Sequence, residues 1–137
     1  GPNHSGAKLH GFLSYLVKIS LKKKKYTLIG YKGKQVRDNI HSHDLIKCFW
    51  EFYKKPKKGE VYNIGGGRFS NCSIIEALDL VEEIAQIKVK RNILKNPRVG
   101  DHIWYVSDTS KFKKHYPKWK QIYDTKKIIE ELVEYQK

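Results

Sequence analysis

Apolar residues recur every three or four positions in several stretches of the chain, the spacing of a helix that buries one face. The clearest stretch is 7–22, and the same pattern returns in 43–54 and in a stretch that begins at residue 125. These patterns predict three amphipathic helices. Their apolar stripes are Leu9, Phe12, Leu13, Leu16 and Val17, then Leu45, Ile46, Phe49, Trp50 and Tyr53, then Ile128, Ile129, Leu132 and Val133.

Capping residues predict where helices begin. Ser73 and Glu76 have the Ser-x-x-Glu spacing of a capping box, in which each side chain accepts a hydrogen bond from the other residue's backbone N–H. This box predicts a further helix that runs to about Gln86. The other predicted caps are Ser42, Asp108 or Thr109, and Thr125, and Pro117 is expected to end the short helix that follows residue 109.

Runs of β-branched and aromatic residues between these helices predict strands over 26–31, 61–64, 88–93 and 103–106. Strands that alternate with helices indicate an α/β fold. The strands are too few and too short for a complete doubly wound sheet. The chain also begins Gly1-Pro2 and contains no Met. We therefore interpret residues 1–137 as a single domain that is part of a longer protein.

The charge of the chain first suggests a polyanionic partner. Lys and Arg number 28 against 14 Asp and Glu, so the formal net charge is +14. Only four of the basic residues are Arg, however, and the Lys residues gather in runs between the predicted helices, a pattern typical of solvated loops. No RNP-like or zinc motif is present. A basic nucleic-acid-binding domain stays an alternative, and we expect no nucleic-acid partner.

The cysteines and the hydropathy pattern indicate in which cellular compartment the protein is expected. Cys48 and Cys72 lie in apolar surroundings, which predicts buried free thiols and favours a cytoplasmic protein. No apolar run approaches the ~18 residues of a membrane span, and the N-terminus has no signal-peptide pattern. We expect no contact with a membrane.

Three motifs that could carry chemistry are weak. The triplet Gly65-Gly66-Gly67 lies between a strand and a helix, as phosphate-binding loops do, but a tight turn explains it without a ligand. His41 and His43 have no third ligand at metal-binding spacing, so no metal site is expected. Tyr-x-x-x-Lys matches are interrupted by proline or straddle a helix start, and we predict none to be catalytic: Tyr53/Lys57, Tyr116/Lys120 and Tyr123/Lys127.

Arg37 and Arg98 are more informative, because both are placed on predicted loops in a chain that otherwise prefers Lys. A guanidinium can grip a phosphate or carboxylate with two parallel hydrogen bonds, so two such residues suggest a diphosphate clamp. The alternative is a pair of structural ion pairs, Arg37 with Asp44 and Arg98 with Asp101. Residue spacing alone does not separate the two interpretations.

Several motifs together resemble one family. Residues 30–38 have the sequence GYKGKQVRD, residues 61–67 have VYNIGGG, and residues 98–101 have RVGD, followed by Ser107, Asp108 and Lys111. In this order they resemble the signatures of NAD-dependent epimerases and dehydratases, which are extended short-chain dehydrogenases. The segments 1–6, 9–13, 37–42 and 100–104 are most similar to members that epimerise CDP-linked dideoxysugars at C2.

The resemblance implies that the chain is the C-terminal, substrate-binding portion of a Rossmann-type enzyme whose N-terminal Rossmann half, with the main NAD site, is missing. It also implies that the full enzyme epimerises a nucleotide-sugar by transient oxidation and forms a homo-oligomer. The substrate-binding residues that it implies are Lys8 and Leu9 beside the diphosphate, Thr27 and Ile29 at the base through their backbone, Arg37 and Arg98 on the diphosphate, and Asp101 near the ribose.

Two features needed for catalysis are not found in the sequence. There is no glycine-rich NAD loop at a first strand-to-helix turn and no uninterrupted helical Tyr-x-x-x-Lys. We therefore expect the chain alone to show no turnover and predict no catalytic, NAD-binding or metal-binding residue in it. The alternatives that stay open are another nucleotide-sugar dehydratase or epimerase, the nucleic-acid-binding domain, and a plain interaction module.

Overall fold

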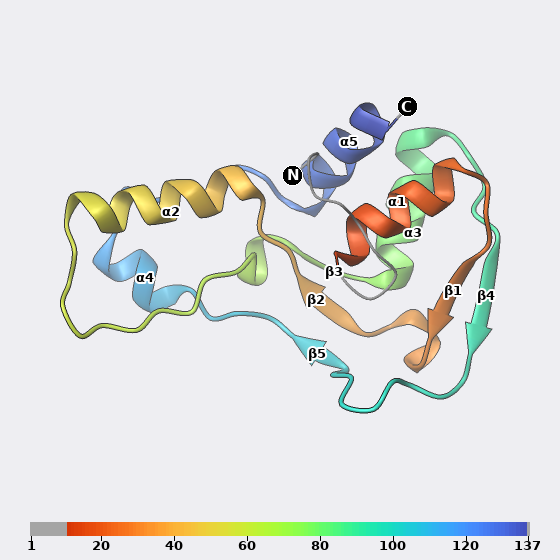
Figure 1. Ribbon diagram of the computed structural model, residues 1–137, viewed down its shortest axis with the longest axis horizontal. Helices are drawn as coiled ribbons and strands as arrows, with labels where there is room; N and C mark the ends of the chain where they lie inside the picture. Colours follow the sequence, from red (N-terminus) through yellow and green to blue (C-terminus); the bar gives the residue numbers. More distant parts are fainter. Residues whose placement is uncertain (1–10, 137) are drawn as a thin grey trace.

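The computed structural model describes residues 11–136, and Figure 1 shows two groups of helices on either side of a small central sheet. All of the predicted helices are present, and residues 7–10 of the first lie outside the described residues. The helices are α1 (Phe12–Leu21), α2 (Ser42–Lys54), α3 (Ile74–Ala85), α4 (Ser110–His115) and α5 (Thr125–Gln136).

The strands of the described residues form two small sheets. In the first, β1 (Tyr26–Ile29) pairs in parallel with β4 (Arg91–Leu94). In the second, β2 (Val36–Asp38) lies between β3 (Asn71–Ser73), to which it is antiparallel, and β5 (Trp104–Tyr105), to which it is parallel. A 3-10 turn, η1 (Tyr31–Gly33), joins β1 to β2 and so links the two sheets. Short strands that alternate with helices confirm the α/β class.

The main core lies where α1, α3 and α5 pack together beside β1, at the right of Figure 1. The apolar stripes predicted for α1 and α5 supply it together with apolar residues of α3, because residues three or four positions apart share one face of a helix. Its fully buried members include Leu16, Val17, Leu78, Val81 and Ile129. Cys72 also belongs to this core, and burial, followed by the nearby Glu76 charge, raises the pKa of its thiol to about 12.

A second, smaller core joins α2 to α4 and the loop after it, at the left of Figure 1. It contains Cys48, Phe112, Tyr116 and Trp119. Phe112 stacks on Tyr116 with ring centroids 4.5 Å apart and meets Trp119 edge-on at 5.2 Å. Burial raises the pKa of the Cys48 thiol to about 11. Cys48 and Cys72 are free and buried, as the sequence predicts.

The predicted strands are partly wrong. β4 and β5 lie within or beside the predicted stretches but are shorter, whereas 61–64 forms no strand. Its composition favours a strand, yet among residues 11–136 no backbone hydrogen bond joins it to a neighbouring strand. β2 and β3 show the opposite difference, because they form strands that the sequence did not predict. They are rich in polar residues that strands disfavour, and their mutual pairing outweighs that preference. Arg37 therefore lies on a strand, not on a loop.

The helix caps also differ from the prediction in part. The capping box at α3 is confirmed, since Ser73 Oγ accepts from Glu76 N at 3.2 Å and Glu76 Oε2 accepts from Ser73 N at 2.7 Å. The predicted cap Ser42 is wrong, because His41 Nδ1 accepts from His43 N at 3.1 Å instead. Asp124, one residue before the predicted cap Thr125, accepts from Lys127 N. At α4, Thr109 holds the cap position and Asp108 accepts from Ser110 N.

Candidate functional site

A hollow of about 540 Å³ opens between α1, β1, β2 and the loop that precedes β5. Five of the seven predicted substrate-binding residues line it. Lys8 and Leu9, the other two, lie outside the described residues. The five that the structure brings together are Thr27, Ile29, Arg37, Arg98 and Asp101.

Local backbone geometry places these residues around one space. β1 ends at Ile29, and Gly30 turns the chain with a φ of +70°. A Cβ at Gly30 would lie 2.5 Å from Pro97 Cα, so only glycine lets the 95–101 loop approach the end of β1 this closely. Gly30 N also donates to Leu94 O at 2.8 Å. The loop that carries Arg98 and Asp101 is thereby held against the end of β1.

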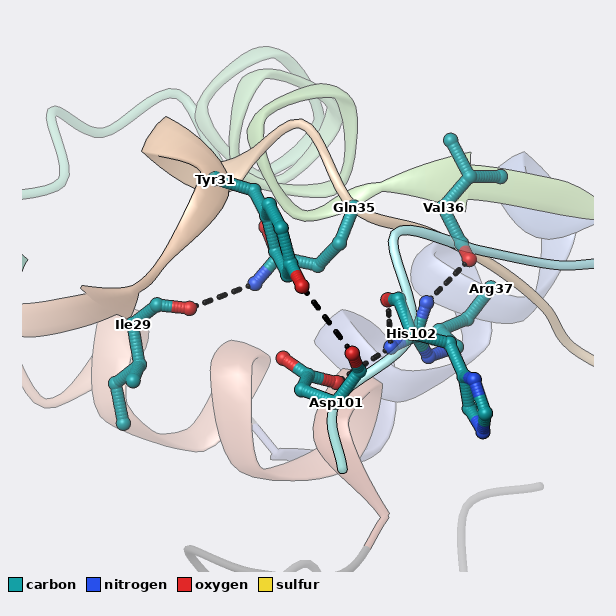
Figure 2. Close-up of polar contacts among 7 residues, drawn as sticks. All are labelled: Ile29, Tyr31, Gln35, Val36, Arg37, Asp101 and His102. Atoms are coloured by element: carbon teal, nitrogen blue, oxygen red, sulfur yellow. Dashed lines mark hydrogen bonds and ion pairs between the residues drawn. The ribbon is translucent and has the colours of Figure 1, made fainter. Parts of the chain in front are cut away.

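Arg37 is held by three acceptors, which Figure 2 shows. Its Nη1 donates to Val36 O at 2.7 Å, and its Nη2 donates both to Asp101 Oδ1 at 2.6 Å and to His102 O. The two ionised side chains are partly exposed, 24% for Arg37 and 22% for Asp101. Water can therefore reach the pair from the hollow.

The two structural ion pairs considered from the sequence are wrong. Arg37 pairs with Asp101, and among the residues that the structure describes no ion pair joins Arg37 to Asp44 or Arg98 to Asp101. Asp44 is unavailable to Arg37, because its buried carboxylate accepts from the backbone N–H groups of Ile122 and Tyr123.

Tyr31 and Gln35 belong to the same site, although neither residue was selected individually from the sequence. Tyr31 Oη donates to Asp101 O at 3.2 Å, which links η1 to the loop (Figure 2). Gln35 lines the hollow and is almost completely buried. Its Nε2 donates to Ile29 O at 2.9 Å, and its Oε1 has no hydrogen-bond partner. Both residues lie within the GYKGKQVRD motif, and this motif was the sequence signal that could have identified them.

The charges around the hollow balance. Arg37 and Arg98 face Asp38 and Asp101 among the described lining residues. Asp38 Oδ2 is committed elsewhere, since it accepts from Gly67 N at 2.8 Å and from Ser107 N at 3.0 Å. Burial, and then the neighbouring Tyr15, raise the pKa of Tyr26 in the hollow wall to about 12, while the charge of Arg98 opposes this rise.

The Gly65–Gly67 triplet is packed against protein atoms. A Cβ at Gly65 would lie 2.3 Å from Ser107 Oγ, and one at Gly66 would lie 2.2 Å from Ser70 O. Gly67 N already donates to Asp38. The triplet therefore serves as a tight turn, and its surroundings do not fit the phosphates of NAD.

The other candidate chemistry finds no support in the described part of the chain. His41 Nε2 donates to Glu131 Oε2 at 2.6 Å, and residues 11–136 contain no group of three His, Cys, Asp or Glu side chains that could hold a metal. Tyr116 Oη donates to Lys55 O rather than facing the hollow. None of the helices in the described residues is long and apolar enough to cross a membrane.

Comparisons with known proteins point to one family. Residues 1–65 match the model of the NAD dependent epimerase/dehydratase family. A CDP-paratose 2-epimerase from Salmonella typhi is 32% identical over 90 residues, which cover 64% of this chain and 26% of that protein.

Two solved structures are similar over most of the chain. UDP-glucuronic acid 4-epimerase from Bacillus cereus, in complex with UDP-glucuronic acid and NAD, matches with a TM-score of 0.80 and 26% identity, over 92% of this chain and 39% of that one. dTDP-glucose 4,6-dehydratase from Bacillus anthracis, in complex with NAD, matches with a TM-score of 0.76 and 25% identity, over 91% of this chain and 38% of that one.

The chain thus spans about a quarter of the length of the curated relative and about two fifths of the length of these structures. Its sequence and its fold agree on the same group of proteins. The chain is thus similar to the NAD-dependent epimerase/dehydratase family in sequence over residues 1–65, and in fold to members of this group over about nine tenths of its length.

Proposed function

We propose that this chain is the C-terminal, substrate-binding part of an NAD-dependent nucleotide-sugar epimerase, and that Arg37 and Arg98 hold the diphosphate of the substrate. The observation that carries the proposal is that these two guanidinium groups, from separate segments, line one hollow of about 540 Å³. Cavities of several hundred Å³ suit ligands of nucleotide size. Planar guanidinium groups match the oxygen geometry of phosphates.

The other residues of the hollow have roles that fit a nucleotide. β1 has a strand neighbour along one edge only in the described sheets, so backbone groups at Thr27 and Ile29 are suited to contact a base. Asp101 would accept hydrogen bonds from the ribose hydroxyls. Lys8 and Leu9 are proposed beside the diphosphate from sequence alone.

We infer a CDP-linked dideoxysugar, altered at C2, as the substrate of the full enzyme. The 32% identity to CDP-paratose 2-epimerase from Salmonella typhi supports the cytidine nucleotide and the carbon. The structures matched above were solved with UDP-glucuronic acid or belong to a dTDP-glucose dehydratase, so uridine and thymidine nucleotides are the comparison ligands.

The chain by itself is proposed to be inactive. Atoms of Ser107, Ser70 and Asn39 occupy the space beside its one glycine triplet, which therefore does not fit the phosphates of NAD. We assign the main NAD site to another part of the full enzyme. Mixing the chain with NAD and a CDP-sugar should give no new product by chromatography. A full enzyme of this kind is proposed to be a cytoplasmic homo-oligomer with no nucleic-acid or membrane partner, and the buried free thiols favour that compartment.

Isothermal titration with a CDP-sugar tests the proposal. Replacing Arg37 or Arg98 with Ala should weaken binding at least about tenfold, the usual effect of losing charge-assisted hydrogen bonds. Arg68→Ala is the matched control, because Arg68 lies outside this hollow, and it should leave affinity unchanged. If both hollow variants fold and bind as tightly as the native chain, the proposed function is wrong. Steep loss of binding with salt to any nucleic acid would favour the alternative.

A further inference from the structure

In the structure, no edge of the Arg37 guanidinium is free to donate two parallel hydrogen bonds to one anion. A guanidinium grips a phosphate through Nη1 with Nη2, or through Nε with Nη2, so both grips need Nη2. Nη2 of Arg37 already donates to Asp101 Oδ1 and to His102 O (Figure 2). A diphosphate can receive a two-pronged contact from Arg37 only if at least one of these acceptors leaves.

Asp101 is the acceptor best placed to leave. The other carboxylate of the hollow, Asp38, is fixed by two backbone N–H groups, whereas among the described residues the Asp101 carboxylate accepts from Arg37 alone. The Arg37–Asp101 pair is also partly exposed. In water-accessible surroundings an ion pair is weak, so a doubly charged anion can compete with one carboxylate.

The backbone around Asp101 can move over a short, defined segment. Gly100 has a φ of +75° and no atom within 4 Å of a Cβ at that position, so it is free to act as a hinge. On the other side, Val36 N donates to Ile103 O at 2.9 Å and β5 pairs with β2, which fixes the chain from residue 103 onward. We infer that motion is confined to residues 100–102.

We propose that Asp101 is an internal competitor for the substrate's diphosphate: the anion takes its place on Arg37, and residues 100–102 move away from β2 as it binds, while Arg98 stays at the hollow. This inference rests on the proposed function of Arg37. Tyr31 opposes the movement, because its hydroxyl holds Asp101 O at 3.2 Å. The contact between Arg37 and Asp101 thus keeps the charges of the hollow balanced until an anion arrives.

Inorganic pyrophosphate is the probe, because it has no ribose that could contact Asp101 directly. Asp101→Asn keeps the size of the side chain and removes the competing charge, so it should raise pyrophosphate affinity about two- to fivefold. Tyr31→Phe loosens the segment without changing any charge and should raise the affinity by a smaller factor. Both are measured by calorimetry at one salt concentration, with thermal unfolding to show that each variant is folded. If Asp101→Asn does not fold, Tyr31→Phe carries the test.

Amide hydrogen exchange gives a second readout that a purely structural role would not move. Pyrophosphate should speed exchange at residues 100–102 in the native chain and leave it unchanged in Arg37→Ala. Unchanged or weaker binding by folded Asp101→Asn, or slower exchange in this segment, overturns the competitor role. If Arg37→Ala and Arg98→Ala both bind pyrophosphate as well as the native chain does, the proposed function fails too, so the two failures are distinguishable.

Discussion

At the scale of single residues, Asp44 is a buried acidic side chain that joins two segments of the chain. It is 1% exposed and lies in the first turn of α2. Its carboxylate accepts from Ile122 N and Tyr123 N at 3.1 to 3.2 Å, and its backbone oxygen accepts from Trp119 Nε1 at 2.9 Å. One residue therefore fixes the start of α2 to the chain segment that leads into α5.

Replacing Asp44 with Ala should lower the free energy of unfolding by about 3 kcal/mol, because two partly buried backbone N–H groups lose a charged acceptor. Urea unfolding followed by tryptophan fluorescence measures the change. Glu51→Ala is the control on the same helix. It removes only the exposed pair with Lys54 and should cost about 0.5 kcal/mol or less. Equal effects of the two variants would contradict the role of Asp44.

Residue spacing predicted part of the candidate site and missed the rest for a physical reason. The family motif led to Thr27, Ile29, Arg37, Arg98 and Asp101, and all five line one hollow, while their binding roles stay predictions. The partner of Arg37 was not predictable from the sequence. Closeness along the chain suggested Asp44 as the partner of Arg37 and Asp101 as the partner of Arg98. Which carboxylate a guanidinium reaches depends on the close approach of Gly30 and Pro97, a contact between distant segments.

At the scale of elements, the helices were predictable and the strands only in part. A helix makes its backbone hydrogen bonds within one segment, so its apolar period and caps are visible locally. A strand needs a partner. The polar strands β2 and β3 form because they pair with each other, and the apolar stretch 61–64 forms none because no described strand lies beside it.

The helix caps allow a direct comparison of a confirmed prediction with a wrong one. Ser73→Ala removes the reciprocal contact with Glu76 and should lower the free energy of unfolding by about 1 kcal/mol. Ser42→Ala should have almost no effect, since His41 supplies the cap of α2. Thermal unfolding of both variants measures the difference. A larger loss for Ser42→Ala than for Ser73→Ala would contradict this assignment.

At the scale of the whole molecule, the two ends of the structure differ in how their apolar residues are covered. α1, α3 and α5 bury their stripes in the main core. α2 buries only Asp44 and Cys48. Four large side chains that recur every three or four positions form a stripe on its outer face and are 53% to 74% exposed. These are Ile46, Phe49, Trp50 and Tyr53, on the helix at the left of Figure 1. The apolar period that predicted α2 correctly did not reveal that its stripe faces outward.

A continuous exposed apolar stripe favours association, and the net charge of +14 opposes it between like copies. We therefore expect this chain to self-associate through α2, and more strongly as salt rises from about 0.05 to about 0.5 M, because screening weakens the repulsion. Size-exclusion chromatography with light scattering measures the mass. The double variant Phe49→Gln, Trp50→Gln should stay monomeric at both salt concentrations, while Tyr135→Gln, which removes an exposed ring from α5 and leaves the stripe on α2 intact, should behave as the native chain. A native chain that is monomeric throughout, or a double variant that associates equally, would show that charge repulsion or another surface decides the outcome instead.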